Sequence, residues 1–134
     1  IMGYRSEVFL GVKKGLEKKL DKVLVKHNLL RDVTSSSFAF IKEEKNFRYK
    51  NFDDKTNEGS DWLNDEWYIY KAGWLKWYSG YRDVDDVTNI IDELAGEDDD
   101  KAFIVALGED GTIHSETGCW WDYIDHVSTL KIQE

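Results

Sequence analysis

Residues 66–84 read EWYIYKAGWLKWYSGYRDV, and this stretch decides the predicted fold. Its opening, EWYIYK, alternates as a β-strand does, with Trp67 and Ile69 on one face and Tyr68 and Tyr70 on the other. Seven of its nineteen residues are Trp or Tyr, side chains that bury a large area and carry a polar group. Its end has the pattern of a helix start. We therefore expect a core-building strand that leads into a helix.

Two segments have the apolar spacing of amphipathic helices, with charged residues opposite the apolar stripe. We expect helices over residues 13–30 and 84–95. Asp83 is the expected N-cap of the second helix and Gly96 lies just past its end, so the start and stop signals agree.

Strand patterns flank these helices. Residues 7–12 alternate, which places Val8, Leu10 and Val12 on one face. Residues 38–52 predict a hairpin with its turn at 43–46. The polar stretch 53–65 predicts a mobile loop, since it contains glycine and shows no periodicity.

Residues 101–118 predict two strands around a glycine-flanked turn, and residues 123–132 predict a last strand. The resulting order is β-α-β-β-β-α-β-β-β. It predicts a single α+β domain over residues 1–134, a two-layer sandwich. Two helices pack on one mostly antiparallel sheet of about five to seven strands.

A sheet with helices on one side leaves its second face to be accounted for. We expect Trp67, Ile69 and Trp74 to face the helices, and Tyr68 and Tyr70 to face away from them. Aromatic residues on both faces leave two alternatives for the second face. Either loops or a second copy in a homo-oligomer cover it, or it is a stacking platform for a planar ligand.

The charge balance excludes some partners. The 134 residues carry a net charge of −9, which disfavours direct binding to nucleic acid and to anionic membrane surfaces. No apolar run approaches the roughly 20 residues of a membrane span. The single cysteine, Cys119, favours a reducing compartment, so we expect a cytoplasmic protein. The acidity either serves solubility or suits docking on a basic protein.

Aromatic and cationic residues near each other in the sequence are the candidate binding residues. In WLKWY, a lysine between two tryptophans pairs aromatic surface with a cation, as a phosphate-bearing planar ligand requires. Arg5 precedes the first strand, at a sheet end where sites commonly form. An ion pair of Arg5 with Glu7 that fixes the terminus is the alternative role. The candidate ligand-binding residues are Tyr4, Arg5, Trp74, Lys76, Trp77 and Tyr78.

A second group could support catalysis. His114, Glu116 and His126 lie near further acids, and alternation would place His114 and Glu116 on one strand face. Such residues suit a small hydrolase or a metal site with nitrogen and oxygen ligands. No H-E-x-x-H spacing is present, and surface histidines in an acidic protein are the plainer interpretation. We therefore predict neither a metal nor a cofactor.

Three motifs carry a resemblance. Residues 2–8 read MGYRSEV, residues 76–87 read KWYSGYRDVDDV, and residues 106–118 read ALGEDGTIHSETG. The chain resembles a group of short phage and prophage proteins that open with M-G-Y-R-S-[DE]-V. It departs from them at Arg82, where a proline tends to precede their second helix. The resemblance implies a small cytoplasmic protein of a phage or mobile element, a class whose members often counter host defences.

The function predicted from these features is a non-enzymatic binding protein that counters a host defence or regulatory component. Its partner would be a nucleotide-like signal or a host protein. One alternative is a phosphodiesterase-like hydrolase that uses His114, Glu116 and His126. Another is an accessory protein without a ligand.

Overall fold

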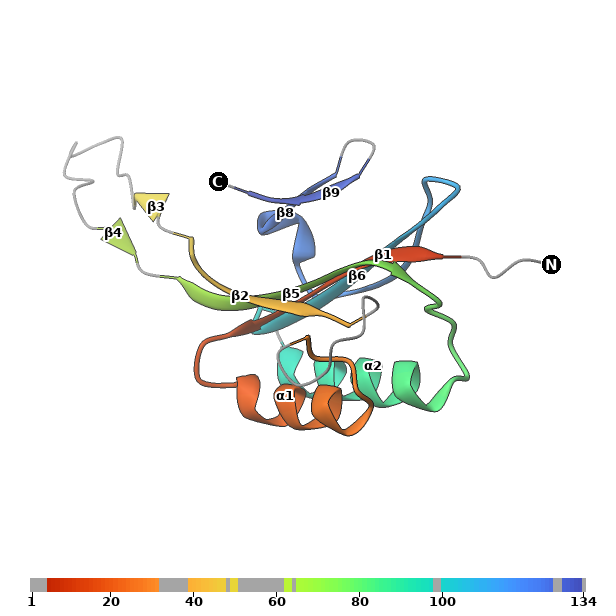
Figure 1. The fold of residues 1–134 in the computed structure, drawn as a ribbon. Coiled ribbons are helices and arrows are strands. Elements are labelled where there is room, and N and C mark those ends of the chain that lie inside the picture. Colours follow the sequence, from red (N-terminus) through yellow and green to blue (C-terminus); the bar gives the residue numbers. More distant parts are fainter. Residues whose placement is uncertain are drawn as a thin grey trace.

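The computed structural model describes residues 5–31, 39–47, 49–50, 62–63, 65–97, 100–126 and 129–133. Its main body is a five-stranded antiparallel sheet with two helices on one face, as Figure 1 shows. The predicted α+β class, with two helices packed on an antiparallel sheet, is confirmed.

The sheet has the strand order β2-β5-β1-β6-β7. Its strands are β1 (Ser6–Lys13), β2 (Ile41–Asn46), β5 (Glu66–Leu75), β6 (Ala102–Gly108) and β7 (Ile113–Thr117). The helices are α1 (Glu17–Lys26) and α2 (Arg82–Ala95).

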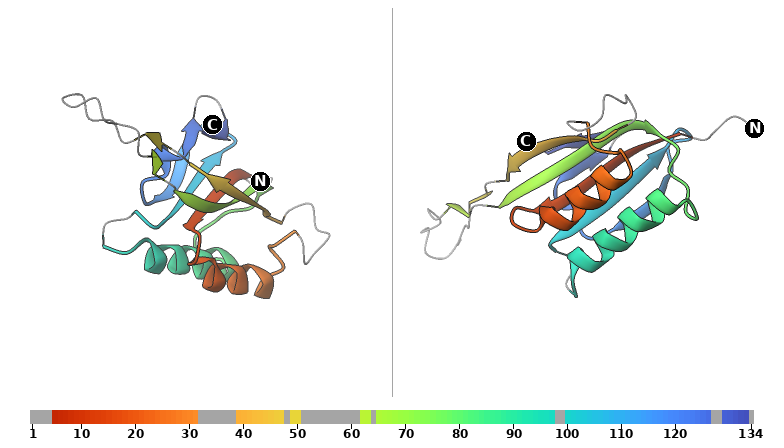
Figure 2. Two further views of the ribbon diagram at one scale, coloured as in Figure 1. Left: turned by 90° about the vertical axis from the view of Figure 1, so that its left-hand side faces the viewer. Right: turned by 60° about the horizontal axis from the view of Figure 1, so that its bottom comes forward.

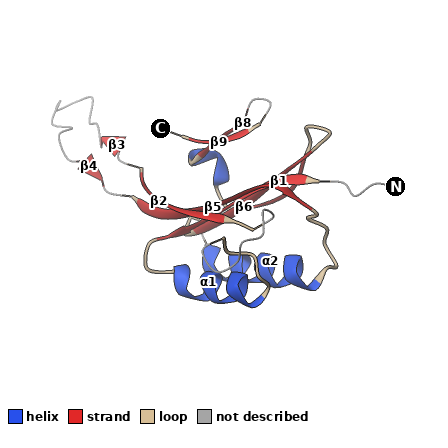
Figure 3. Cartoon of the chain, viewed as in Figure 1, coloured by secondary structure: helices blue, strands red, loops and turns tan. Residues whose placement is uncertain are grey.

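Short elements complete the described chain. β3 (Tyr49–Lys50) pairs with β4 (Trp62–Leu63) between β2 and β5. After β7 follow a 3-10 turn, η1 (Trp120–Asp122), and the hairpin of β8 (Ile124–His126) and β9 (Leu130–Ile132). Figure 3 shows this C-terminal segment on the opposite side of the sheet from both helices. No described helix is long and apolar enough to cross a membrane.

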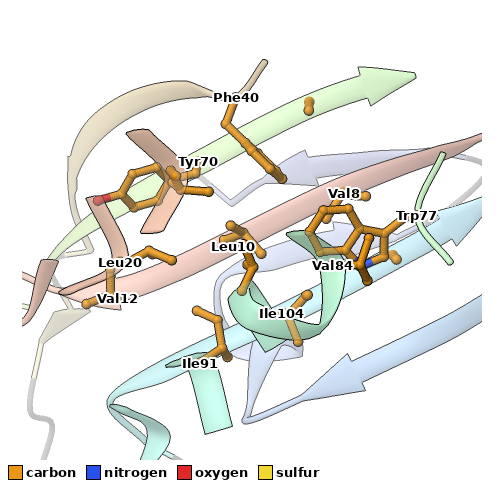
Figure 4. Packing of buried hydrophobic residues seen from close by; sticks show 14 of the residues in the cluster. Val8, Leu10, Val12, Leu20, Phe40, Tyr70, Trp77, Val84, Ile91 and Ile104 are labelled. Atoms are coloured by element: carbon orange, nitrogen blue, oxygen red, sulfur yellow. The ribbon is translucent and has the colours of Figure 1, made fainter. Parts of the chain in front are cut away.

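The helix-side core follows the period-2 pattern of β1. Val8, Leu10 and Val12 lie on one face, as predicted, and are fully buried against both helices. Figure 4 shows these three side chains among residues of the helices and of neighbouring strands, including Leu20 and Ile91. Burial of this apolar cluster is the main stabilising contribution to the helix–sheet packing.

A second core lies on the other face of the sheet. Phe9, Phe103 and Val105 pack there with residues of the C-terminal segment, among them Tyr123 and Ile124. Both views in Figure 2 show the β8–β9 hairpin away from the helices. The chain therefore covers part of the second face itself, which is one of the alternatives predicted for it.

The predicted faces of β5 are wrong. Tyr70 is fully buried in the helix-side core and Tyr68 packs against it, whereas Trp67 and Ile69 belong to the second core. Residues opposite each other on paired strands share a face, and Tyr70 lies opposite Leu10. The Tyr70 hydroxyl donates a hydrogen bond to the Asp21 carboxylate of α1, which satisfies its polar group on that side.

Three predicted element boundaries are also wrong. Residues 43–46 form no turn, because β2 runs unbroken to Asn46 and pairs with β5. This strand is at the sheet edge, where charged residues are usual, and its sequence IKEEKN therefore resembled a turn. The predicted last strand, 123–132, is instead the two short strands β8 and β9. Helix α1 begins at Glu17 rather than at residue 13.

Asp83 does not cap α2. Tyr81 occupies the N-cap position, and Asp83 lies inside the first turn, where its carboxylate accepts a hydrogen bond from the Val84 N–H. The Asp85 carboxylate accepts from the Gly80 N–H just before the helix. Acidic residues still stabilise the helix start, but from within it. The predicted loop 53–65 lies largely outside the described residues.

Candidate functional site

A register shift in β5 shapes the candidate site. Val8 of β1 lies opposite Ala72, while Ser6 lies opposite Leu75, so two β5 residues oppose Glu7 alone. Such a bulge turns the side chains next to it. Trp74, at the bulge, lies on the second face rather than against the helices as predicted, and 52% of it is exposed.

Beside this bulge is a cavity of about 330 Å³. Arg5 and Trp74 both line it, although they are far apart in the sequence. Glu7 and Glu109 add two carboxylates, and Thr129 contributes from the end of the β8–β9 loop. The described lining therefore combines an indole ring, a guanidinium group and two carboxylates, which are negatively charged and accept hydrogen bonds.

Hydrogen bonds fix the two carboxylates. Glu109 Oε1 accepts from the Arg5 backbone N–H at 2.7 Å, and the Glu109 N–H donates to the Arg5 carbonyl at 3.1 Å. Glu7 Oε1 accepts from the Leu130 N–H at 2.7 Å, which ties β9 to β1. Glu7 therefore helps to hold the C-terminal segment against the sheet. The role predicted from the sequence was an ion pair with Arg5. Within the described chain, no hydrogen bond is formed by Oε2 of Glu7 or of Glu109.

Two more cavities adjoin the first along the second face. One of about 270 Å³ shares Glu7 and Gly73 with it. The other, of about 290 Å³, shares Phe9, Lys71 and Leu130 with the middle one. We call the three together the second-face groove. It runs between the β1–β5–β2 half of the sheet and β9.

The far end of the second-face groove is basic. Lys45, Lys71 and Lys131 line its last cavity together with one acid, Glu43. The Lys71 ammonium lies 3.2 Å from the Glu43 carboxylate, in a pair that is about two-fifths exposed. Lys45 and Lys131 form no ion pair within the described residues.

Among the predicted binding residues, only Arg5 and Trp74 meet in this groove. Trp77 is 3% exposed and packs edge-on against Phe40 in the helix-side core, so it does not line the groove. Tyr78 packs against Tyr81, and Lys76 is exposed; neither lines the groove. Tyr4 lies outside the described residues.

The structure separates the predicted catalytic group. His114 lies at a register shift in β7, and its Nε2 is 2.7 Å from the Ser6 hydroxyl. Glu116 accepts a hydrogen bond from the Trp120 indole at 3.3 Å. The expected shared face of His114 and Glu116 is wrong. Glu116 lies opposite Val105 of the second core, whereas His114 is the extra residue at the shift and contacts Ser6 of β1. His126 is exposed on β8.

No group of three or more His, Cys, Asp or Glu side chains in the described part of the chain is arranged to hold a metal ion. Burial lowers the pKa of His114, and the nearby Asp110 opposes this effect. The neutral imidazole is therefore favoured at its contact with Ser6.

Four groove residues were not found from the sequence: Glu109, Lys45, Lys71 and Lys131. The turn sequence GEDG marked the neighbourhood of Glu109, but not its bond to Arg5. Lys45 could not be found while residues 43–46 were interpreted as a turn. No family model, curated protein or solved structure matches this chain.

Proposed function

We propose that this protein is a non-enzymatic binding protein that holds a nucleotide-like ligand in the second-face groove. The observation that carries the proposal is that Arg5 and Trp74 line one cavity. An exposed indole gives a flat surface on which a base stacks, and the guanidinium suits an anionic group. The two carboxylates give acceptors for the polar edge of the base.

The biological role in this proposal rests on the resemblance of the opening heptad to phage and prophage proteins. A protein of that kind would counter a host defence in the host cytoplasm by withholding a nucleotide signal. Withholding the signal requires tight binding and no turnover. The aromatic ring and the charged side chains of the groove would provide the binding.

A second candidate partner is a basic host protein. The net charge of −9 favours it, since an acidic surface attracts a basic one over long range. The two candidates differ in which residues they need. A nucleotide requires Trp74, whereas docking by net charge depends on the acidic surface as a whole.

The test is a thermal-shift panel of cyclic di- and trinucleotides, ADP-ribose derivatives and mononucleotides. A ligand at 100 times its dissociation constant adds about 2.7 kcal/mol to the free energy of unfolding. We expect at least one compound to raise the melting temperature, and its mass to be unchanged after recovery. An altered mass would indicate hydrolysis instead.

Trp121 offers a matched control for Trp74. It is 54% exposed on η1 and lines none of the groove cavities. Trp74→Ala should abolish the ligand-induced shift and Trp121→Ala should retain it. No shift with any compound would overturn the nucleotide proposal and direct the search to a basic protein partner.

A further inference from the structure

The two ends of the second-face groove have opposite character. At one end, Trp74 lies with Glu7 and Glu109, and Arg5 is the only cation among the described residues that line that cavity. At the other end, three lysines line a cavity with a single acid. The chain has 18 basic and 27 acidic residues, yet three lysines gather at this end. A groove with one acidic and one basic end suits a ligand that has a polar base at one end and anionic groups at the other. It does not suit a ligand that is anionic throughout.

The acidic end selects among bases. Guanine presents two neighbouring N–H donors on its pairing edge, and a carboxylate can accept one at each oxygen. At Glu109, Oε2 would accept one donor, and Oε1 would accept the other beside its bond from the Arg5 N–H. Adenine presents one donor beside an acceptor, which a carboxylate oxygen repels. Glu109 keeps Oε2 without a hydrogen bond among the described residues, on a turn that its own contacts with Arg5 hold in place. Glu109 is exposed, so its discrimination against adenine would come from repulsion of the adenine ring nitrogen and not from leaving a buried acceptor unpaired.

The basic end suits phosphates. Lys45 on β2, Lys71 on β5 and Lys131 on β9 line one cavity from three strands. Lys71 is three positions along β5 from Trp74, which corresponds to about 10 Å at the strand rise. A base at Trp74 would therefore place its first phosphate toward Lys71. Lys45 lies opposite Trp67, four positions further along β5, so only the far end of a phosphate chain would approach Lys45 and Lys131 in the cavity that the three lysines share.

We propose that the second-face groove binds a guanine nucleotide, with the base against Trp74 and Glu109 and the phosphate chain among Lys45, Lys71 and Lys131. This inference rests on the proposed function, because it identifies the ligand class of the same groove.

The first experiment measures the affinities of wild-type protein for guanosine, GMP, GDP, GTP and ATP by isothermal titration calorimetry at fixed salt. We expect GTP to bind at least about tenfold more tightly than guanosine, since charge-assisted hydrogen bonds to phosphate are strong. GTP should also bind at least about tenfold more tightly than ATP. Raising the salt concentration should weaken GTP binding and leave guanosine binding nearly unchanged.

Variants separate the two ends. Lys45→Ala with Lys131→Ala should weaken GTP binding about tenfold or more and leave guanosine binding unchanged. Lys18→Ala with Lys22→Ala removes the same charge from exposed positions on α1, on the other face of the sheet, and is the matched control. Glu109→Gln should weaken GTP binding and reduce the preference for GTP over ATP.

One variant should gain affinity. Glu43→Gln releases Lys71 from its 3.2 Å ion pair and should strengthen GTP binding several-fold. Glu93→Gln is its control, because it breaks an exposed Lys–Glu pair of the same length between the two helices. A gain of affinity cannot arise from a variant that fails to fold.

The outcomes distinguish this inference from the proposed function. If no nucleotide binds, or if Trp74→Ala binds as wild type does, the proposed function fails and the inference fails with it. Suppose instead that nucleotides bind in a Trp74-dependent manner, but the groove lysines have no more effect than the control lysines. The phosphate placement is then wrong and the proposed function stands. Equal affinity for ATP and GTP would overturn the base assignment alone.

Discussion

The ring of Phe103 on β6 occupies the space in front of Gly11, its partner across the β1–β6 ladder. A Cβ atom at Gly11 would overlap the Phe103 ring at Cε2. Phe103 is fully buried. Its ring stacks on that of Tyr123 with centroids 5.7 Å apart, and its centroid lies 5.5 Å from that of Trp67. The rings of Trp67 and Tyr123 also contact each other, with centroids 4.4 Å apart, so Phe103 belongs to a packed cluster of three rings. Glycine at position 11 leaves the room that this cluster needs against the sheet.

Gly11→Ala should destabilise the protein by about 1–3 kcal/mol, because the added methyl group overpacks a ring that cannot move aside. Urea unfolding measures this change. Gly73→Ala is the control: it adds the same methyl group to β5 at a position where, apart from the two chain neighbours, no described residue has an atom within 4 Å of the added Cβ. Its free energy of unfolding should stay within about 0.5 kcal/mol of wild type. Equal losses in the two variants would contradict the packing described for Phe103.

Asp65 forms hydrogen bonds that connect the C-terminal segment to the sheet. It is 8% exposed, and its two carboxylate oxygens accept from the Trp67 indole at 2.8 Å and the Tyr123 hydroxyl at 2.9 Å. Asp65→Ala leaves both donors without this partner and should cost about 2–4 kcal/mol, whereas Tyr123→Phe removes one hydrogen bond and should cost about 1 kcal/mol. Chemical denaturation compares them. A loss for Asp65→Ala no greater than for Tyr123→Phe would show that the carboxylate does not organise this contact.

His114 should make stability depend on pH. Burial lowers the pKa of the folded His114 below its ordinary value of 6.5. As the pH falls through 6.5, the unfolded chain takes up a proton that the folded protein resists, so stability declines toward the lower folded pKa. Above 6.5 the imidazole is neutral in both states and this effect is absent. We expect the melting temperature to fall between pH 7.5 and 5.5.

The variant His114→Gln removes the titrating group and keeps an acceptor and donors for the Ser6 hydroxyl. Its melting temperature should change less than that of wild type over the same pH interval. An unchanged slope would assign the pH dependence to other groups.

Regular local patterns predicted the helix-side half of the fold. Val8, Leu10 and Val12 alternate without interruption, so the prediction that they share one face of β1 is confirmed. The prediction for Tyr70 is wrong, because alternation alone does not say which face of a strand turns toward the helices. The pairing of Tyr70 with Leu10 and the contact of its hydroxyl with Asp21 decide this. No local pattern encodes that contact.

The groove was harder to predict because it depends on long-range register. Trp74 reaches the second face through a shift that is defined only by the pairing of β5 with β1. Lys45 lies in the same cavity as Lys71 because β2 is an edge strand paired to β5, where the sequence indicated a turn. Arg5 and Trp74 were both candidates from the sequence, yet nothing local indicated that they would share a cavity.

Trp74→Ala should leave the free energy of unfolding nearly unchanged, because about half of the side chain is exposed and it is not among the buried core residues. Urea unfolding beside Trp121→Ala measures this directly. A loss above about 2 kcal/mol would show that Trp74 supports the fold, and its effect on binding would then be ambiguous.

The most direct test of the account is the calorimetric titration of GTP into wild type, Trp74→Ala and Trp121→Ala at one salt concentration. Loss of base stacking is worth about 1–3 kcal/mol, so Trp74→Ala should bind at least about fivefold more weakly. Trp121→Ala should bind as wild type does. Equal affinities in the two variants, or no binding of GTP to wild type, would contradict the assignment of the second-face groove as a guanine nucleotide site.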